Sequence, residues 1–232
     1  MKTIGMLGGM SWESSVAYER IANQEVRRRL GGTHSADLIV RSYDFARVEA
    51  LQEADDWEGA AALLAGDAAR LEAAGADLVI LCTNTMHRLA PSIEAALTVP
   101  FLHIGDAVAD AVVATGLDAV GLLGTRYTME GAFYRERLEA AGLRVVVPGE
   151  ASRQQVHDVI YGELVRGEVR DASRAAFQRI VGELVREGAQ GVIAGCTEIE
   201  LLLRPEDVDV PLFPSAKLHA LAAVSAALAG LA

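Results

Sequence analysis

Short apolar runs alternate with longer segments of mixed hydrophobic and polar residues along the whole chain. The apolar runs are nearly continuous and end in small or polar residues, which is typical of strands buried in a parallel sheet. The longer segments between them predict helices. We expect strands within residues 3–10, 36–44, 72–85, 99–106, 119–126, 143–150, 185–198 and 210–217. We expect helices over residues 12–30, 57–74, 128–141 and 172–187.

The second half of the chain repeats the order of elements in the first half. The run "TIGMLGGM" at 3–10 resembles "AVGLLGTR" at 119–126, and "EAAGADLVILCTNT" at 72–85 resembles "VREGAQGVIAGCTE" at 185–198. Corresponding elements lie about 106 to 116 residues apart and follow one another in the same order. A fixed offset kept over several elements indicates an internal repeat of one strand–helix unit.

This repeat predicts an α/β fold of two pseudo-symmetric lobes, each with a mainly parallel four-stranded sheet flanked by helices. We expect the first lobe to comprise residues 1–99 plus 209–232 and the second to comprise residues 100–208. Ligands of open parallel sheets bind beyond the carboxyl ends of the strands. The strand ends here carry the small, hydrogen-bonding sequences "GGMSW", "LCTNTMH", "GTRYT" and "GCTEIE". We therefore expect the active site in a cleft between the lobes.

Composition and charge exclude some functions. Hydrophobic residues make up 51% of the 232 residues, enough for a buried core. With 21 basic and 32 acidic residues the net charge is −11, which repels phosphate backbones, so we expect no nucleic-acid partner. The basic cluster "RRRL" at 27–30 precedes Gly31 and fits the C-terminal end of a helix. The turn "GMLGGM" lacks the G-x-G-x-x-G spacing of a dinucleotide site, so we expect no nucleotide.

Two cysteines in the whole chain make no disulfide framework, and neither they nor the 5 histidines have metal-ligand spacing. No secretory signal follows Met1, and the apolar segment 220–232 is too short to span a bilayer. We therefore expect a soluble cytoplasmic protein that binds no metal and has no membrane partner.

The two cysteines occur in similar stretches, "LCTNTMH" and "GCTEIE", which raises the question of whether they are a matched pair. Aligning the Gly-Ala turns before the two strands, at an offset of 113, places Thr83 opposite Cys196 and Cys82 opposite Gly195. Because strand side chains alternate between faces, a slip of one residue moves a side chain to the other side. We expect Cys82 to be a buried packing residue. A residue inserted in the first strand would restore the cysteine pair, but a gap inside a buried strand is costly.

The sequence resembles the aspartate/glutamate racemase family over its whole length. The segments that carry the resemblance are "IGMLGGMSWES" (4–14), "LCTNTMH" (81–87), "LLGTRYTM" (122–129) and "GVIAGCTEI" (191–199). The family usually has C-N-T-x-H in the first lobe and G-C-T-E or G-C-T-H in the second, and its two cysteines act as acid and base on opposite faces of the substrate. Here Thr83 stands at the first cysteine position. The chain therefore resembles the L-aspartate/glutamate-specific subgroup, which has a Thr/Cys pair.

The resemblance implies that Thr83 and Cys196 are the catalytic pair. It implies substrate contacts from Asn84, Thr85, Thr125 and Thr197, with Met10 on a turn and Gln52 on a loop as weaker candidates. It also implies a small acidic amino acid as substrate, no cofactor and a homodimer. Some relatives have a lysine in an I-Y-x-x-x-K-x-G segment that binds the distal carboxylate. The segment "IYGELVRG" at 160–167 has Val165 at that position and Arg166 next to it.

The two catalytic groups differ in acidity. Cys196 comes where a strand ends and a helix is expected to start, and a helix N-terminus lowers the pKa of a thiol, so we expect partial thiolate character. The alcohol of Thr83 ionises far less readily and is the poorer base. We expect an asymmetric site. Glu198 is interpreted as an acid or, equally, as a capping or supporting residue, and His87 as a helix-start or supporting residue.

The function expected from the sequence is the interconversion of L- and D-aspartate and/or glutamate by two-base proton transfer at Cα, without pyridoxal phosphate. One alternative is a related isomerase of the same fold, similar to maleate isomerase or hydantoin racemase. Another is a non-catalytic module that binds a small ligand.

Overall fold

The eight strands expected from the sequence form two four-stranded sheets in the computed structural model, which describes residues 1–230. The chain divides into two compact units, Met1–His103 with His219–Ala232 and Ile104–Leu218. The first boundary lies four residues and the second ten residues beyond the expected one, because the fourth strand of each sheet completes its own unit. Residues 231–232 of the predicted first lobe lie outside the described residues.

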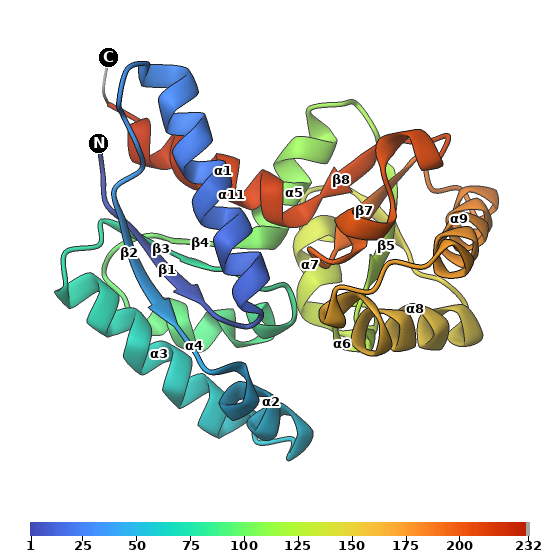
Figure 1. Cartoon of the computed structure of the whole chain (residues 1–232), viewed down its shortest axis with the longest axis horizontal. Helices are drawn as coiled ribbons and strands as arrows, with labels where there is room; N and C mark the ends of the chain where they lie inside the picture. Colours follow the sequence, from blue (N-terminus) through green and yellow to red (C-terminus); the bar gives the residue numbers. More distant parts are fainter. Residues whose placement is uncertain (231–232) are drawn as a thin grey trace. The chain divides into compact units, whose positions relative to one another are not determined.

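The first unit contains a parallel sheet with the strand order β2-β1-β3-β4 (Figure 1). Its strands are β1 (Ile4–Gly8), β2 (Leu38–Ser42), β3 (Leu78–Leu81) and β4 (Phe101–Leu102). Its helices are α1 (Trp12–Leu30), α2 (Phe45–Glu53), α3 (Trp57–Ala73), α4 (Ala90–Ala95) and the short 3₁₀ helix η1 (Thr85–Leu89). The last helix, α11 (Ser215–Leu228), belongs to this unit from His219 onward.

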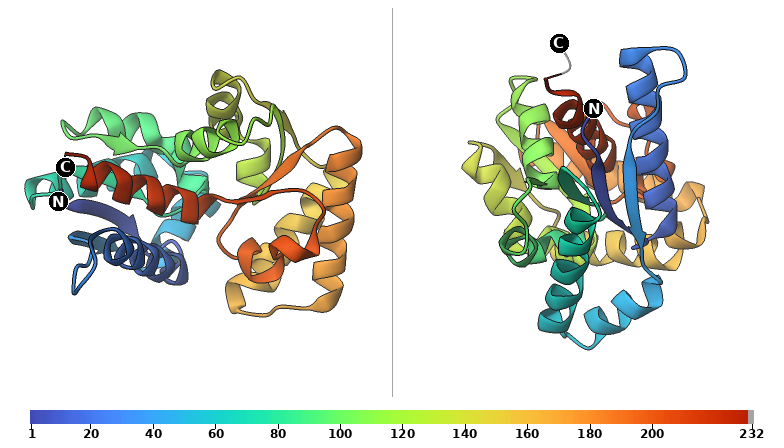
Figure 2. Two further views of the ribbon diagram at one scale, coloured as in Figure 1. Left: turned by 90° about the horizontal axis from the view of Figure 1, so that it is seen from above. Right: turned by 90° about the vertical axis from the view of Figure 1, so that its left-hand side faces the viewer.

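The two faces of the first sheet are covered by different helices. Leu7 and Leu81 belong to one apolar cluster with Leu64 of α3. The helix α1 lies along the other side of β1 and β2, as the right-hand view of Figure 2 shows. The N–H of Lys2 donates to the carbonyl of Ala227 at 2.9 Å, which ties the beginning of the chain to α11. Covering both faces explains why these strands read as continuous apolar runs.

The second unit contains a parallel sheet with the equivalent order β6-β5-β7-β8. Its strands are β5 (Ala119–Gly124), β6 (Arg144–Val146), β7 (Gly191–Gly195) and β8 (Leu212–Pro214). Its longer helices are α5 (Ile104–Val113), α7 (Ala132–Ala140), α8 (Glu150–Gly162) and α9 (Asp171–Arg186). Shorter ones are α6 (Arg126–Glu130), η2 (Leu164–Arg166), α10 (Ile199–Leu202) and η3 (Pro205–Asp207).

Side chains of β5 and β7 alternate between two apolar clusters. Leu123 and Ala194 belong to the cluster formed with α8 and α9. Leu122 and Ile193, one residue earlier in each strand, belong to the cluster formed with α5 and α7. This is the alternation expected of a strand buried on both faces. It fixes which side of the sheet each residue at the strand end faces.

The register within each sheet confirms the predicted alignment of the two halves. In the first sheet Leu81 of β3 lies beside Leu7 of the central strand. In the second sheet Ala194 of β7 lies beside Leu123 of the central strand. Since 81 plus the offset of 113 is 194, β3 and β7 hold equivalent positions against their central strands. The residues that follow these strands therefore correspond at the same offset.

The helix expected over 128–141 is two helices in the structure. The helix α6 ends at Glu130, α7 begins at Ala132, and Gly131 between them is extended, with ψ of 135°. A β-carbon at Gly131 would lie 2.5 Å from the carbonyl oxygen of Tyr127. The chain makes a tight corner at this residue, and only glycine fits without displacing the neighbouring main chain.

The helix α1 has the bounds expected from the sequence. Three arginines, at 27, 28 and 29, lie in its last turn, and Gly31 closes it with φ of 75°. The predicted placement of the basic cluster at a helix end is confirmed. Within residues 1–230, no helix combines the length and the apolar character that a membrane crossing requires.

Candidate active site

The first strand ends in a turn that requires glycine. Gly9 has φ of 85°, and a β-carbon there would lie 2.3 Å from the backbone nitrogen of Tyr43. Its N–H donates to Oγ of Ser15 at 2.7 Å, and Ser11 caps the N-terminus of α1. Met10, a predicted substrate contact, lies in this turn as expected and is buried. The turn places a helix N-terminus, with its main-chain N–H donors, directly after the strand.

The end of β3 carries the predicted catalytic Thr83 and its neighbours. Cys82 is completely buried, which raises the pKa of its thiol, whereas Thr83 is half-buried. Asn84 and Thr85 are buried at the start of η1. Four consecutive residues at this strand end therefore combine one inert thiol with three polar side chains.

Cys82 has no counterpart in the second unit because that unit leaves no room for one. Its equivalent is Gly195, where a β-carbon would lie 2.7 Å from the carbonyl oxygen of Leu123. The cysteines of "LCT" and "GCT" therefore occupy positions that are not equivalent in the two sheets. The equivalent of Cys196 at the offset of 113 is Thr83.

Gln52 was expected on a loop, and the structure corrects this. It lies in the last turn of α2, a helix whose N-terminus is capped by Asp44, and it is buried. The sequence does not predict this helix because its amphipathic pattern is weak and only two residues separate it from β2. Unlike the other candidates in this unit, Gln52 does not come from the end of a strand.

In the second unit, Thr125 stands at the end of the central strand. It is buried and caps α6, since its Oγ1 accepts a hydrogen bond from the N–H of Thr128 at 3.4 Å. Gly124 pairs with Gly195 in the ladder between β5 and β7. The next residues, Thr125 and Cys196, therefore leave neighbouring strands at the same edge of the sheet. The structure brings these two predicted residues to one place.

Cys196 forms a hydrogen-bonded group with the two residues that follow it. Its Sγ donates to Oε2 of Glu198 at 2.8 Å, and Oγ1 of Thr197 donates to the same oxygen at 2.8 Å. Cys196 and Thr197 are half-buried and Glu198 is buried. The Glu198 carboxylate is thus an acceptor for the thiol, which fits the interpretation of Glu198 as a supporting residue.

The expectation of partial thiolate character at Cys196 is wrong for this arrangement. Burial raises the pKa of the Cys196 thiol well above its usual range, and the negative charge of Glu198 raises it further. The helix that follows, α10, has only four residues and begins at Ile199, so it offers little dipole to oppose these effects. The thiol is therefore held in its protonated form.

Glu200 is a second carboxyl group in this part of the chain, and the sequence interpretation did not single it out. Its Oε1 is buried and has no hydrogen-bond partner. Burial raises the pKa of Glu200 to about 7, with Lys217 opposing and Glu198 adding to the shift. The E-x-E spacing of Glu198 and Glu200 was the available signal, since two carboxyl groups close together disfavour each other's ionisation.

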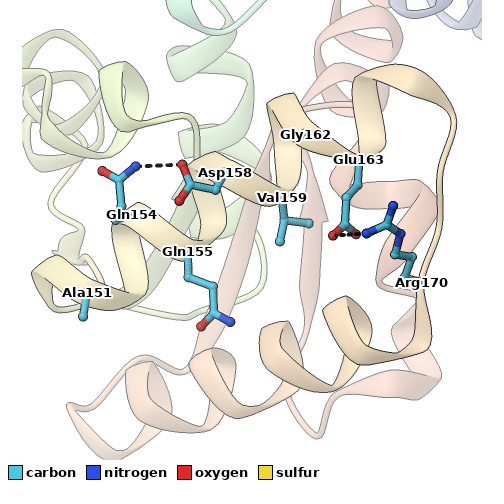
Figure 3. Close-up of a pocket in the computed structure, with 8 residues that line it drawn as sticks. All are labelled: Ala151, Gln154, Gln155, Asp158, Val159, Gly162, Glu163 and Arg170. Atoms are coloured by element: carbon cyan, nitrogen blue, oxygen red, sulfur yellow. Dashed lines mark hydrogen bonds and ion pairs between the residues drawn. The ribbon is translucent and has the colours of Figure 1, made fainter.

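A surface groove of 470 Å³ runs along α8 in the second unit (Figure 3). None of its lining residues is a predicted site residue. Its polar groups already bind one another: Gln154 donates to Asp158 at 2.7 Å, and Glu163 lies 3.3 Å from Arg170. Within the part of the chain that the structure describes, no three His, Cys, Asp or Glu side chains are grouped in a way that could hold a metal ion.

Comparison with known proteins gives matches along most of the chain. The family model of Asp/Glu/hydantoin racemases matches residues 7–223. A candidate Asp/Glu racemase from Yersinia pestis, known from its crystal structure, is 48% identical, with 98% of this chain and 100% of that chain covered and a TM-score of 0.94. An aspartate racemase homologue from Pyrococcus horikoshii is 35% identical, with coverages of 98% and 99% and a TM-score of 0.86.

A curated relative comes from Bacillus subtilis. The broad-specificity amino-acid racemase RacX is 28% identical over 162 residues, which are 70% of this chain and 70% of RacX. The matched family model spans both units, so the likeness includes the ends of both β3 and β7.

Proposed function

The chain belongs to the Asp/Glu/hydantoin racemase family, and on that basis we propose that it interconverts the L- and D-forms of aspartate, glutamate or both by two-base proton transfer at Cα. Thr83 and Cys196 are the two groups, one for each face of Cα. The observation that carries the proposal is the matched register of the two sheets, which gives an alcohol and a thiol the same position after β3 and β7.

Cys196 and Glu198 work as a pair. In the resting state the protonated thiol can donate to a carbanion directly. To act as base, Cys196 first passes its proton to Glu198: the S–H bond breaks and an O–H bond forms on Oε2, 2.8 Å away. The thiolate then takes the α-proton, which restores the S–H bond and leaves the electron pair on Cα.

Thr83 completes the reaction from the other face. Its hydroxyl delivers a proton to Cα and becomes an alkoxide. The proton held on Glu198 then passes through solvent to the Thr83 alkoxide. Every group is then in its starting form. Because an alcohol ionises far less readily than a thiol, the Thr83 step is the harder one in the direction that needs it as base. The two enantiomers should therefore differ in the rate at which they lose the α-proton.

Stabilising the carbanion falls to hydrogen-bond donors aimed at the substrate carboxylate. The turn at Met10, the start of η1 at Asn84 and Thr85, and Thr125 at the start of α6 offer buried polar groups and N–H donors at strand ends. Thr197 supplies a hydroxyl beside Cys196. We include Gln52, from α2, as a further contact. No cofactor takes part in this scheme.

The distal carboxylate is the least specified part of the substrate. Val165 stands at the family lysine position and packs against an apolar cluster of the second unit, and the neighbouring Arg166 is exposed. A site without that lysine selects less strongly for a substrate whose side chain carries a carboxylate. The relative RacX carries the name of a broad-specificity racemase, so neutral amino acids belong in the substrate panel beside aspartate and glutamate.

Solvent deuterium exchange tests the proposal. Each enantiomer of each amino acid is incubated with the protein in D₂O, and deuterium at Cα and formation of the opposite enantiomer are followed. We expect both for an acidic amino acid, with unequal initial exchange rates for L and D. Cys196→Ala should lower racemisation at least about 100-fold, whereas Cys82→Ala serves as the matched thiol control and should keep it.

Other outcomes would replace the proposal. Wild-type activity in Cys196→Ala would remove Cys196 from the mechanism. Turnover of maleate or of a hydantoin in place of amino acids would indicate a different isomerase of the family. Tight binding of an acidic amino acid without exchange at Cα would indicate a binding module.

We also propose that the protein is a homodimer. Trp12 and Val16, on one face of the first two turns of α1, are 63% and 41% exposed, and an apolar pair of this kind supports contact with a second copy. Light scattering during size-exclusion chromatography measures the mass directly. A mass equal to one chain of 24.6 kDa at micromolar concentration would contradict the proposal.

A further inference from the structure

The main chain of Thr83 is held by hydrogen bonds on both sides. Its N–H donates to the carbonyl of Leu81 at 2.9 Å. Its own carbonyl oxygen lies 2.7 Å from Nδ1 of His87. Because a carbonyl can only accept, Nδ1 of His87 carries the proton and donates it. The histidine four residues downstream thus fixes the peptide that follows the Thr83 side chain.

His87 is itself held in place. Its ring is buried. The main-chain N–H of His87 donates to the carbonyl of Asn84 at 3.1 Å within η1. The ring packs edge-on against His103, with centroids 4.5 Å apart, and lies 5.7 Å from the ring of Phe101 and 5.6 Å from that of His219. These rings come from β4, the residue after it, and α11. A ring confined in this way can present Nδ1 in only one direction.

The ring of His219, on which His87 packs, has both nitrogens occupied. The hydroxyl of Tyr18 in α1 lies 2.9 Å from Nδ1, and Nε2 lies 2.8 Å from the carbonyl of Leu102. Since the carbonyl accepts, Nε2 carries the proton, and Nδ1 accepts from the tyrosine. The helices α1 and α11 and the strand β4 therefore fix the His219 ring, and the His219 ring packs against His87.

We propose that His87 is a positioning residue for proton transfer at Thr83. The inference rests on the proposed role of Thr83 in racemisation. The Oγ1 of threonine is placed by the backbone and a single, stiff χ1 torsion. Fixing the Thr83 carbonyl therefore fixes the direction of its hydroxyl. A catalytic group displaced by about 1 Å loses on the order of 100-fold in rate. Proton transfer by an alcohol is already slow, so its rate depends strongly on correct placement.

The consequence is specific to one face of the substrate. Cys196 has a support of its own in Glu198, within a different unit of the chain. Loss of the His87 hydrogen bond should slow the proton transfer that Thr83 performs and spare the transfer that Cys196 performs. A histidine needed only for folding would lower both together.

Two substitutions separate the hydrogen bond from the packing. His87→Phe keeps a planar ring between its neighbours but removes the donor to Thr83. His87→Asn loses part of the ring but retains an amide N–H close to the position of Nδ1. Circular dichroism and the thermal midpoint show whether each variant is folded.

The readout is the ratio of deuterium exchange rates at Cα of the two enantiomers in D₂O. Thr83→Ala identifies the enantiomer whose exchange depends on Thr83. We expect His87→Phe to slow exchange of that enantiomer by about 10- to 100-fold and to change the other by less than about threefold. His87→Asn should recover most of the lost rate.

The outcomes distinguish the two proposals. If Thr83→Ala leaves the ratio unchanged, the two-base function fails, and the role of His87 fails with it. If Thr83→Ala shifts the ratio while His87→Phe leaves it as in the wild type, only the positioning role is overturned. Equal slowing of both enantiomers in His87→Phe, or no recovery in His87→Asn, also overturns it.

Discussion

Glu198 determines how the Cys196 thiol behaves in the resting protein. Its carboxylate accepts the thiol hydrogen at 2.8 Å and, after burial, is the main cause of the raised thiol pKa. Glu198→Gln removes the negative charge but keeps a side chain of the same size. We therefore predict a lower pKa for Cys196 and faster alkylation by iodoacetamide at pH 7 to 8. Peptide mapping by mass spectrometry reports the rate at Cys196.

The control for this change is Glu187→Gln, which removes an exposed carboxylate from the same unit. Cys82 provides an internal reference, because it is completely buried and should resist alkylation in every variant. The alkylation rate of Cys196 is measured as a function of pH. If the midpoint of this curve is unchanged or higher in Glu198→Gln, the carboxylate does not hold the thiol proton.

At the level of residues, the register of the site could be predicted and its electrostatics could not. The strand period and the internal repeat were enough to separate Cys82 from Thr83, because they depend only on sequence spacing. The acidity of Cys196 depends on the side-chain direction of Glu198 and on the length of α10, four residues instead of a full helix. Neither quantity follows from a pattern of apolar positions.

Gly131 divides the segment after β5 into two helices. Its backbone angles are open to any residue, but an added β-carbon would meet the Tyr127 carbonyl at 2.5 Å and the Phe133 ring at 2.6 Å. We predict that Gly131→Ala lowers the free energy of unfolding by about 1–3 kcal/mol. Urea denaturation followed by circular dichroism measures this change.

Gly182→Ala is the matched control for this substitution. Gly182 lies inside α9, and a β-carbon there would have no atom within 4 Å apart from the nearby backbone of its own helix. Alanine in a helix interior should raise the stability by up to about 1 kcal/mol. If the free energy of unfolding falls in Gly131→Ala and rises in Gly182→Ala, the loss at Gly131 comes from its neighbouring atoms. An unchanged free energy of unfolding in Gly131→Ala would mean that the corner relaxes around the added methyl group.

At the level of elements, every strand was predictable, but several helices were not. The strands β1, β3, β5 and β7 are buried along their whole length, so an unbroken apolar run marks each of them, whereas β2 and β6 have exposed positions. The helix α5 begins two residues after β4 ends, so its apolar sequence reads as a continuation of the strand. The helix α8 was missed because its first two turns are largely polar. The break at Gly131 depends on contacts with Tyr127 and Phe133, which spacing alone does not reveal.

The two units relate differently to the order of the chain. The second unit is one continuous segment, Ile104–Leu218, whereas the first needs both ends of the chain. The first unit gains its last helix, with His219, only after all of the second unit has been made. Pairing of segments so distant in sequence is slow compared with local contacts. The packing of the His219 ring on His87 is therefore among the last contacts of the molecule to form.

Glu200 contributes a component of the pH dependence that lowers stability as the pH rises. The pKa of this carboxyl group rises from its usual 4.5 to about 7 in the folded protein. A raised pKa contributes stability that is complete below pH 4.5 and is lost as the pH rises through 7. We predict that the stability of Glu200→Gln relative to wild type rises by on the order of 2 kcal/mol between pH 4.5 and 8.5. Glu206→Gln, an exposed change in the same unit, should give a flat difference.

His219 contributes a component of opposite slope over a similar pH range. Burial lowers its pKa from the usual 6.5 to about 4, against the opposing effect of its hydrogen bond to Leu102. The unfolded chain therefore binds a proton between these pH values that the folded protein does not. A lowered histidine pKa contributes stability that is complete above pH 6.5 and is lost as the pH falls towards 4, by roughly 3 kcal/mol.

We predict that His219→Gln removes this loss. Glutamine can keep the N–H donor to Leu102 but has no ring to protonate, so its unfolding free energy should fall less steeply than that of the wild type between pH 6.5 and 4. The carboxylates titrate in both proteins and cancel in the difference. His34→Gln, at an exposed histidine of the same unit, is the control and should leave the slope unchanged. Equal slopes for wild type and His219→Gln would mean that His219 is protonated without unfolding, and that the ring supporting His87 tolerates a charge.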